Sequence, residues 1–282
     1  MRADDPECAL TKDRLAVDIF RTVPFERGLI DQLTNLADTL TDPPYRRSQY
    51  QEADLRCREA LEKACNTGSL HLPGVLADCA YIPTMTGDLT RAAVMYTDAI
   101  QAAAKRKDKL AAAIAKGNLA FVEHALGHLD EAARLYNESL GSSSKLGETD
   151  ADLAETNVRY ARLLSDLGTE AKASELFKAA TGQMTAKDLG YLLEDIQHVI
   201  KANPNPAAWG RIVAHPSQPL PPPQRTRMEC TRDDFDVTTL AAGGAVIPLG
   251  TRPRFAQPPN QNIETCRRLA ALRSQTSMSS SP

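Results

Sequence analysis

The sequence has few aromatic residues and no long hydrophobic run. Aromatic residues make up 5% of the 282 positions, whereas apolar residues reach 42% and alanine is abundant. Small side chains suit closely packed helices, and strands favour aromatic and β-branched residues, so the composition favours an all-α fold. No run approaches the roughly 20 apolar residues that span a bilayer, and the acidic N-terminus does not resemble a secretory signal. We therefore expect a cytoplasmic protein that does not contact a membrane.

Cysteine is also scarce, and no charge of one sign dominates the whole chain. The six cysteines form no C-x-x-C pair and are too few to crosslink a chain of this length, so we expect reduced thiols. The net charge of -3 gives no indication of nucleic-acid binding. The charge is unevenly divided, because residues 203–282 hold nine Arg, no Lys and five acidic residues.

The composition changes sharply after Lys201. The last 80 residues hold 12 of the 18 prolines, which predicts a mostly disordered tail over 203–282 with one candidate helix at 263–274. Two stretches of the tail resemble docking motifs, PLPPPQRTR (219–227) and RDDFDV (232–237). In the first, the arginine lies one position too late for a class II SH3 ligand. We interpret both stretches as linker.

One skeleton appears three times, in GDLTRAAVMYTDAI (87–100), GHLDEAARLYNESL (127–140) and GTEAKASELFKAAT (168–181). A glycine is followed after five residues by alanine, after four more by an aromatic residue, and after three more by a small residue. Spacings of four and three place these residues on one helical face. A fourth copy without the glycine has Cys57 in the aromatic position. The anchors of the four copies are Ala53; Gly87, Ala92 and Tyr96; Gly127, Ala132 and Tyr136; and Gly168, Ala173 and Phe177.

A helical pattern precedes each copy, at 29–40, 74–85, 115–126 and 156–167. The glycine between the two helices allows a left-handed turn, and the anchor alanine lets their backbones approach closely. A single pair cannot bury its apolar face alone, so neighbouring pairs must stack. Pro83 lies inside the 74–85 pattern and predicts a kink or an end of that helix.

Residues 26–182 resemble the tetratricopeptide repeat (TPR) family, in the form with a period of about 40 residues known from kinesin light chains. The resemblance implies an all-α, right-handed superhelical solenoid of about four helix pairs. We expect an N-terminal helix or extension over 1–25, a capping helix over 183–202 and the disordered tail over 203–282. A generic helical bundle and a HEAT-type solenoid are the alternatives.

The resemblance implies that the first helix of each pair lines a concave groove. Its contacts are expected fourteen residues before each anchor alanine and three residues further on, at Asn35, Asp78, Tyr81, Asn118, Phe121, Arg159 and Arg162. An asparagine amide can bond an extended backbone, and an arginine can grip a carboxylate. Glu155 stands where a carboxylate clamp needs lysine, so we do not expect such a clamp. Asn118 and Arg159 are expected to be exposed; the alternatives are an inter-repeat contact for these two and core packing for Tyr81 and Phe121.

No catalytic motif is apparent. His124 and His128 have the spacing of a zinc hydrolase without its glutamate, and we interpret them as surface residues. We therefore expect no enzyme, no cofactor and no metal, and the oligomeric state is unknown. The favoured function is a non-enzymatic adaptor or scaffold that binds an extended peptide or helix of another protein. The alternative is a ligand- or partner-responsive regulator whose basic tail acts as a switch by meeting acids such as Asp78 and Glu155.

Overall fold

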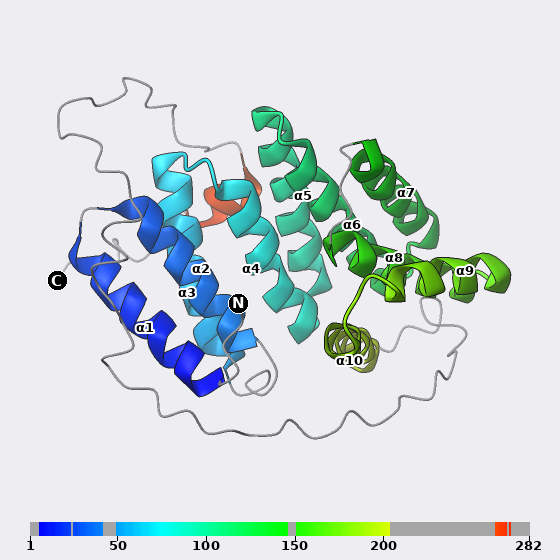
Figure 1. Ribbon diagram of the computed structural model, residues 1–282. Helices are drawn as coiled ribbons and strands as arrows, with labels where there is room; N and C mark the ends of the chain where they lie inside the picture. The colour runs from blue at the N-terminus through cyan, green and yellow to red at the C-terminus, as the bar shows by residue number, and fades with distance from the viewer. Residues whose placement is uncertain are drawn as a thin grey trace. The chain divides into compact units, whose positions relative to one another are not determined.

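The computed structural model describes residues 6–23, 25–41, 49–145, 151–203, 263–269 and 271, and these contain helices and no strand. The all-α fold class is therefore confirmed (Figure 1). The chain divides into two compact units at Ser69 and Leu70, and the second unit includes residues 263–269. The first unit contains α1 (Pro6–Thr22), α2 (Glu26–Thr41) and α3 (Tyr50–Thr67). The second contains α4 (Leu72–Thr86), α5 (Leu89–Arg106), α6 (Lys109–Leu126), α7 (Leu129–Lys145), α8 (Ala151–Asp166), α9 (Glu170–Thr181) and α10 (Ala186–Ala202).

In the first unit, α2 packs against both α1 and α3, and its leucines fill the core between them. Leu33 and Leu40 are completely buried, and Leu36 is nearly so. The predicted N-terminal extension is thus a helix packed on the first predicted pair.

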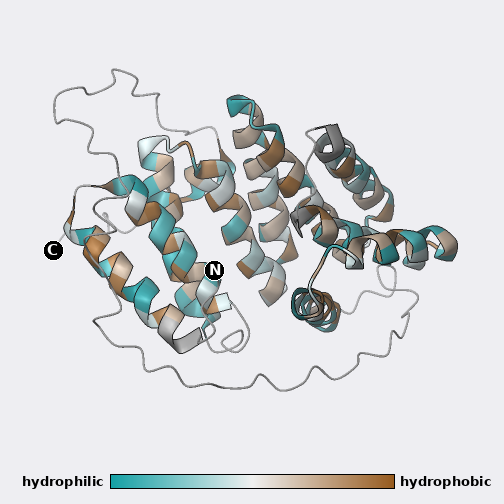
Figure 2. Cartoon of the chain, in the orientation of Figure 1, coloured by the Kyte–Doolittle hydropathy of each residue, from teal (hydrophilic) through white to brown (hydrophobic). Residues whose placement is uncertain are grey.

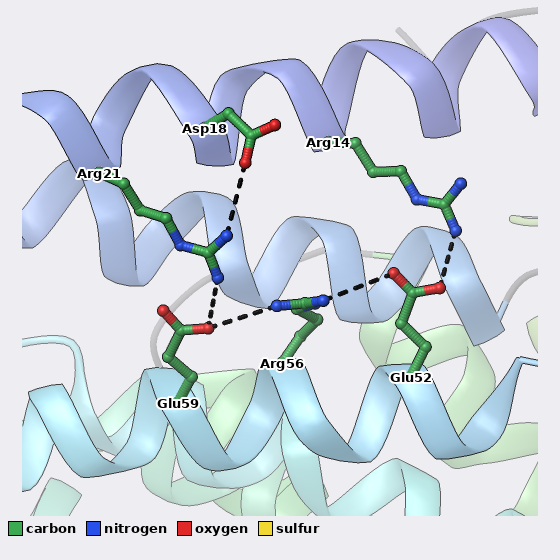
Figure 3. A network of polar contacts seen from close by, with 6 residues as sticks. All are labelled: Arg14, Asp18, Arg21, Glu52, Arg56 and Glu59. Atoms are coloured by element: carbon green, nitrogen blue, oxygen red, sulfur yellow. Dashed lines mark hydrogen bonds and ion pairs between the residues drawn. The ribbon is translucent and has the colours of Figure 1, made fainter.

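A line of ion pairs joins α1 to α3 (Figure 3). Arg14 lies 2.7 Å from Glu52, and Arg21 lies 2.7 Å from Glu59. Arg56 stands between the two glutamates, at 3.8 Å and 3.5 Å. Because all five side chains are partly exposed, each pair contributes only about 0–1 kcal/mol.

In the second unit, helices pack as consecutive pairs, α4 with α5, α6 with α7 and α8 with α9. The first helices also contact one another, α4 with α6 and α6 with α8. They form one layer, which we call the first-helix layer. Each helix carries both apolar and polar residues (Figure 2), as expected when one face packs on a neighbour and the other meets water.

The predicted repeat anchors lie where the helices of a pair meet. Ala53, Ala92 and Ala132 are completely buried, and Ala173 is 6% exposed. The aromatic residues Tyr96 and Tyr136 are buried as well, whereas Phe177 is half-buried. Phe177 lies on α9, which packs chiefly on α8 and has no further pair beyond it among the described residues.

The turns inside the pairs are left-handed, as the sequence predicts. Gly87, Gly127 and Gly168 have φ angles of 87°, 88° and 79°, which only glycine adopts without strain. At the junction of α5 and α6 the same role falls to Lys107, with a φ of 59°. Pro83 does not end its helix, because α4 continues to Thr86.

The prediction of reduced thiols is wrong for the cysteines that the structure describes. Cys57, Cys65, Cys79 and Cys266 are all disulfide-bonded. Cys57 is buried in the aromatic position of its repeat copy, as expected of a small apolar residue, but it is not a free thiol. Disulfides persist in oxidising compartments and are rare in a reducing cytosol, so they count against a cytoplasmic location, which stays a prediction.

Replacing Tyr136 with alanine is expected to lower the free energy of unfolding by about 3–5 kcal/mol, because it empties a fully buried site beside Tyr160. Ala132→Leu should also destabilise, because it overpacks a contact with no free space. Phe177→Ala is the matched control and should cost less, since its ring is only half-buried. Chemical denaturation measures all three. Changes under about 0.5 kcal/mol for the first two, the range of surface substitutions, would show that the repeat register is wrong.

Labelling with maleimide in denaturant without a reductant is expected to leave the four described cysteines unmodified, because their sulfur atoms are already in disulfides. The same labelling after reduction should modify all four, and peptide mass spectrometry identifies the sites. Full modification before reduction would contradict the disulfide assignment.

Candidate peptide-binding surface

The structure brings most of the predicted groove residues together on the first-helix layer. Asp78 and Tyr81 lie on α4, Asn118 and Phe121 on α6, and Arg159 and Arg162 on α8. Asn35 lies on α2 in the first unit, where it is exposed. Among these six residues only Asp78 is exposed, and the other five are buried or half-buried.

Arg159 is buried, with 8% of its surface exposed, and the expectation that it faces solvent is therefore wrong. Its Nη1 donates a hydrogen bond to Oδ1 of Asn118 at 2.8 Å, and its guanidinium lies 5.1 Å from the centre of the Phe121 ring. Its Nη2 reaches Oε2 of Glu155 at 3.5 Å. Asn118 and Arg159 thus form the inter-repeat contact that the sequence left as an alternative. Phe121, 5% exposed, belongs to the core, which was also an open alternative.

The charge of Arg159 is retained although the side chain is buried. Burial disfavours the charged form, but the Glu155 carboxylate, together with Tyr136, Tyr96 and Asp195, outweighs it and raises the pKa of the guanidinium. Burial in turn raises the pKa of Tyr96 to about 12, so its hydroxyl stays protonated. The positive charge of Arg159 in the first-helix layer is therefore favoured by Glu155 of its own helix and by groups on three other helices, α5, α7 and α10.

Arg162 is occupied within its own helix. Its Nε donates to Oδ2 of Asp166 at 2.9 Å, and the same oxygen lies 3.1 Å from Nε2 of His124. His124 is completely buried, so its interpretation as a surface histidine is wrong. His128 is exposed and lies 2.6 Å from Glu123. In the described part of the chain, no group of three or more His, Cys, Asp or Glu residues is placed to hold a metal ion.

Helix α10 lies against the first-helix layer, where it packs on α4 and α8 (Figure 1). Its apolar face, formed by Leu192, Ile196 and Val199, is buried. Oδ2 of Asp195 accepts a hydrogen bond of 2.8 Å from the Tyr81 hydroxyl.

The far end of α10 is fixed to the end of α4. Nε2 of His198 donates a hydrogen bond of 2.9 Å to the carbonyl of Met85, one of the carbonyls that a helix terminus leaves without an intrahelical partner. A Cβ atom added at Gly87 would lie 3.7 Å from the Cβ of Ala202. A helix that only capped the stack would contact the last pair alone, whereas α10 reaches back to α4.

Residues 263–269, which we call the C-terminal segment, make a separate contact with α5. Asp98 on α5, 3% exposed, accepts hydrogen bonds from the backbone of Glu264 at 3.3 Å and of Thr265 at 2.7 Å. Helical structure at 264–269 agrees with the candidate helix seen in the sequence. The tail regions around 219–227 and 232–237 lie outside the described residues, as does most of the expected disordered tail.

No protein-family model matches the sequence, and no curated protein does. Among solved structures, the chain is similar to the crystal structure of BtubC (BKLC) from P. vanneervenii, with a TM-score of 0.55 and 23% identity. The match covers 70% of this chain and 84% of that chain. At this identity the likeness shows the fold alone, which is a helical repeat. None of the helices described for this chain is long and apolar enough to cross a membrane.

Arg159→Ala is expected to lower the free energy of unfolding by about 3 kcal/mol, because it empties a buried site beside Phe121 and leaves Oδ1 of Asn118 without its donor. The control is Arg134→Ala on α7, which removes an exposed arginine with two ion pairs to its own helix and should leave stability nearly unchanged. Chemical denaturation compares the two variants. Equal, small effects of both substitutions would mean that Arg159 is solvated rather than buried.

Proposed function

We propose that the second unit is a non-enzymatic protein-interaction module whose first-helix layer binds a helix of a partner protein. The observation that carries this proposal is α10 itself. An amphipathic helix of the chain packs on α4 and α8, and its Asp195 accepts a hydrogen bond from one of the predicted groove residues, Tyr81. The helical-repeat fold, found also in BtubC, supports an interaction role at a general level.

The chemistry of α10 indicates which partner the surface fits. Its buried residues, Leu192, Ile196 and Val199, follow the four and three spacing of helices that bind in grooves. Asp195 stands beside this apolar stripe and adds a negative charge that acts on Arg159. A partner helix would therefore carry an apolar stripe with an acidic residue next to it. This favours a helix over an extended peptide as the ligand.

A partner helix must compete with α10 for this surface. Only residues 182–185 join α9 to α10, so α10 is held near the layer at a high effective concentration. The alternative function, a partner-responsive regulator, gains support from this occupancy. The switching element in that case is α10 and not the basic tail.

The proposal predicts that a fluorescent peptide of residues 184–203 binds in trans to the full chain once its own α10 is released. Leu192→Asp with Val199→Asp releases α10, because charges cannot enter the apolar contact. Anisotropy titration should give at least tenfold tighter binding to this chain than to the wild type, where tethered α10 competes. Adding Tyr81→Phe should weaken the binding, since Asp195 of the peptide loses its hydrogen-bond donor.

The matched control for Tyr81→Phe is Tyr50→Phe on α3, which removes a hydroxyl from the first unit and should not alter the affinity. Equal binding to the wild-type and released chains, together with no effect of Tyr81→Phe, would contradict the proposal. A peptide with Asp195→Ala gives an independent check that does not depend on the folding of a receptor variant.

A further inference from the structure

Asp98 on α5 is a buried carboxylate, and within the described part of the chain its hydrogen-bond partners all come from one distant stretch. Besides the backbone N–H groups of Glu264 and Thr265, its Oδ2 accepts a bond of 2.6 Å from the Thr265 hydroxyl. Removing a carboxylate from water is costly unless charge-assisted hydrogen bonds replace the lost solvation. Three bonds to one carboxylate meet that requirement, so the burial of Asp98 depends on the C-terminal segment.

Apolar packing completes the contact. Ile263, directly before the helical turn, is completely buried, and Cys266 is 6% exposed. Arg267 and Arg268 point to solvent on the opposite side and pair with Glu264 of their own segment. One face of the C-terminal segment thus makes the contact, through a branched apolar residue and a hydroxyl two positions later. Its other face is polar and exposed.

In the alternative function predicted from the sequence, the basic tail meets acids such as Asp78 and Glu155. The contact that the structure shows is on a different helix, and it is made by backbone and threonine donors. Its recognition elements are therefore local to positions 263–266 and do not depend on the net charge of the tail.

We propose that α5 carries a second docking site, centred on Asp98, for a peptide segment of the pattern Ile-x-Thr that begins a helical turn. The occupant is the C-terminal segment of the same chain. The 59 residues from 204 to 262 connect α10 to this segment, and Cys266 of the segment is disulfide-bonded, so the non-covalent contact at Asp98 is measured with this crosslink removed. This site lies on a second helix of a pair and does not rest on the function proposed for the first-helix layer.

The test uses the full chain with its own segment disabled by Ile263→Asp, Thr265→Val and Cys266→Ser, which remove the apolar anchor, the hydroxyl donor and the disulfide. Isothermal titration with a synthetic peptide of residues 261–272, carrying Cys266→Ser, should then show binding. Adding Asp98→Asn to the receptor should weaken it at least tenfold. Asp130→Asn, which removes an exposed carboxylate of α7, is the charge-matched control and should leave the affinity unchanged.

A peptide with Thr265→Val should also bind at least tenfold more weakly, and this arm does not depend on the folding of an Asp98 variant. No binding to the disabled chain, or equal affinity with Asp98→Asn and with the Thr265→Val peptide, would overturn the site. Light scattering on the wild-type chain distinguishes the occupant. A monomer agrees with docking within the chain, and a dimer that is lost with Thr265→Val would overturn the in-chain occupant in favour of a second copy.

Discussion

The close approach of two helices at a buried alanine is the contact on which the rest of the second unit depends. At Ala92 and Ala132 the side chain is a single methyl group, and neither residue has any exposed surface. A larger residue would separate the helices of a pair, and the aromatic residue four positions later would no longer fill the space beside them. With the pairs held at this distance, their first helices meet as one layer. That layer is the surface on which α10 lies.

The close packing of the helix pairs also bears on the buried charge of Arg159 in the first-helix layer. Arg159 lies between pairs, with its guanidinium 5.1 Å from the centre of the Phe121 ring, and Tyr96 and Tyr136 are close enough to act on its charge; only 8% of its surface is exposed. Such a cation is tolerated only with hydrogen-bonding and anionic partners, which Asn118 and Glu155 supply. Asp195 of α10 adds a further negative charge to this environment. The match between α10 and the first-helix layer therefore has two parts, an apolar stripe and a negative charge near Arg159.

The repeat fold was predictable because each of its signals is local and recurs. Gly87 and Gly127 mark left-handed turns, and the alanine and aromatic residues that follow keep fixed spacings. The pattern of one helix pair therefore locates the next pair along the sequence. The site was less predictable because its contacts are remote in sequence. Arg159 bonds a residue 41 positions away, and Asp195 bonds one 114 positions away. The sequence predicted a capping helix over 183–202, and it could not show which helices that helix packs on. The disulfides escaped prediction for the same reason, since the spacing of cysteines along the chain does not determine which of them meet.

Native-state hydrogen exchange of residues 186–202 tests most directly whether α10 occupies the first-helix layer. An isolated helix of this length is marginal in water, so protection of its amides requires packing. The account predicts that α10 is strongly protected in the wild-type chain and loses protection with Tyr81→Ala and His198→Ala, while α6 and α7 stay protected. Unprotected α10 amides in the wild type, or protection that both substitutions leave unchanged, would contradict it.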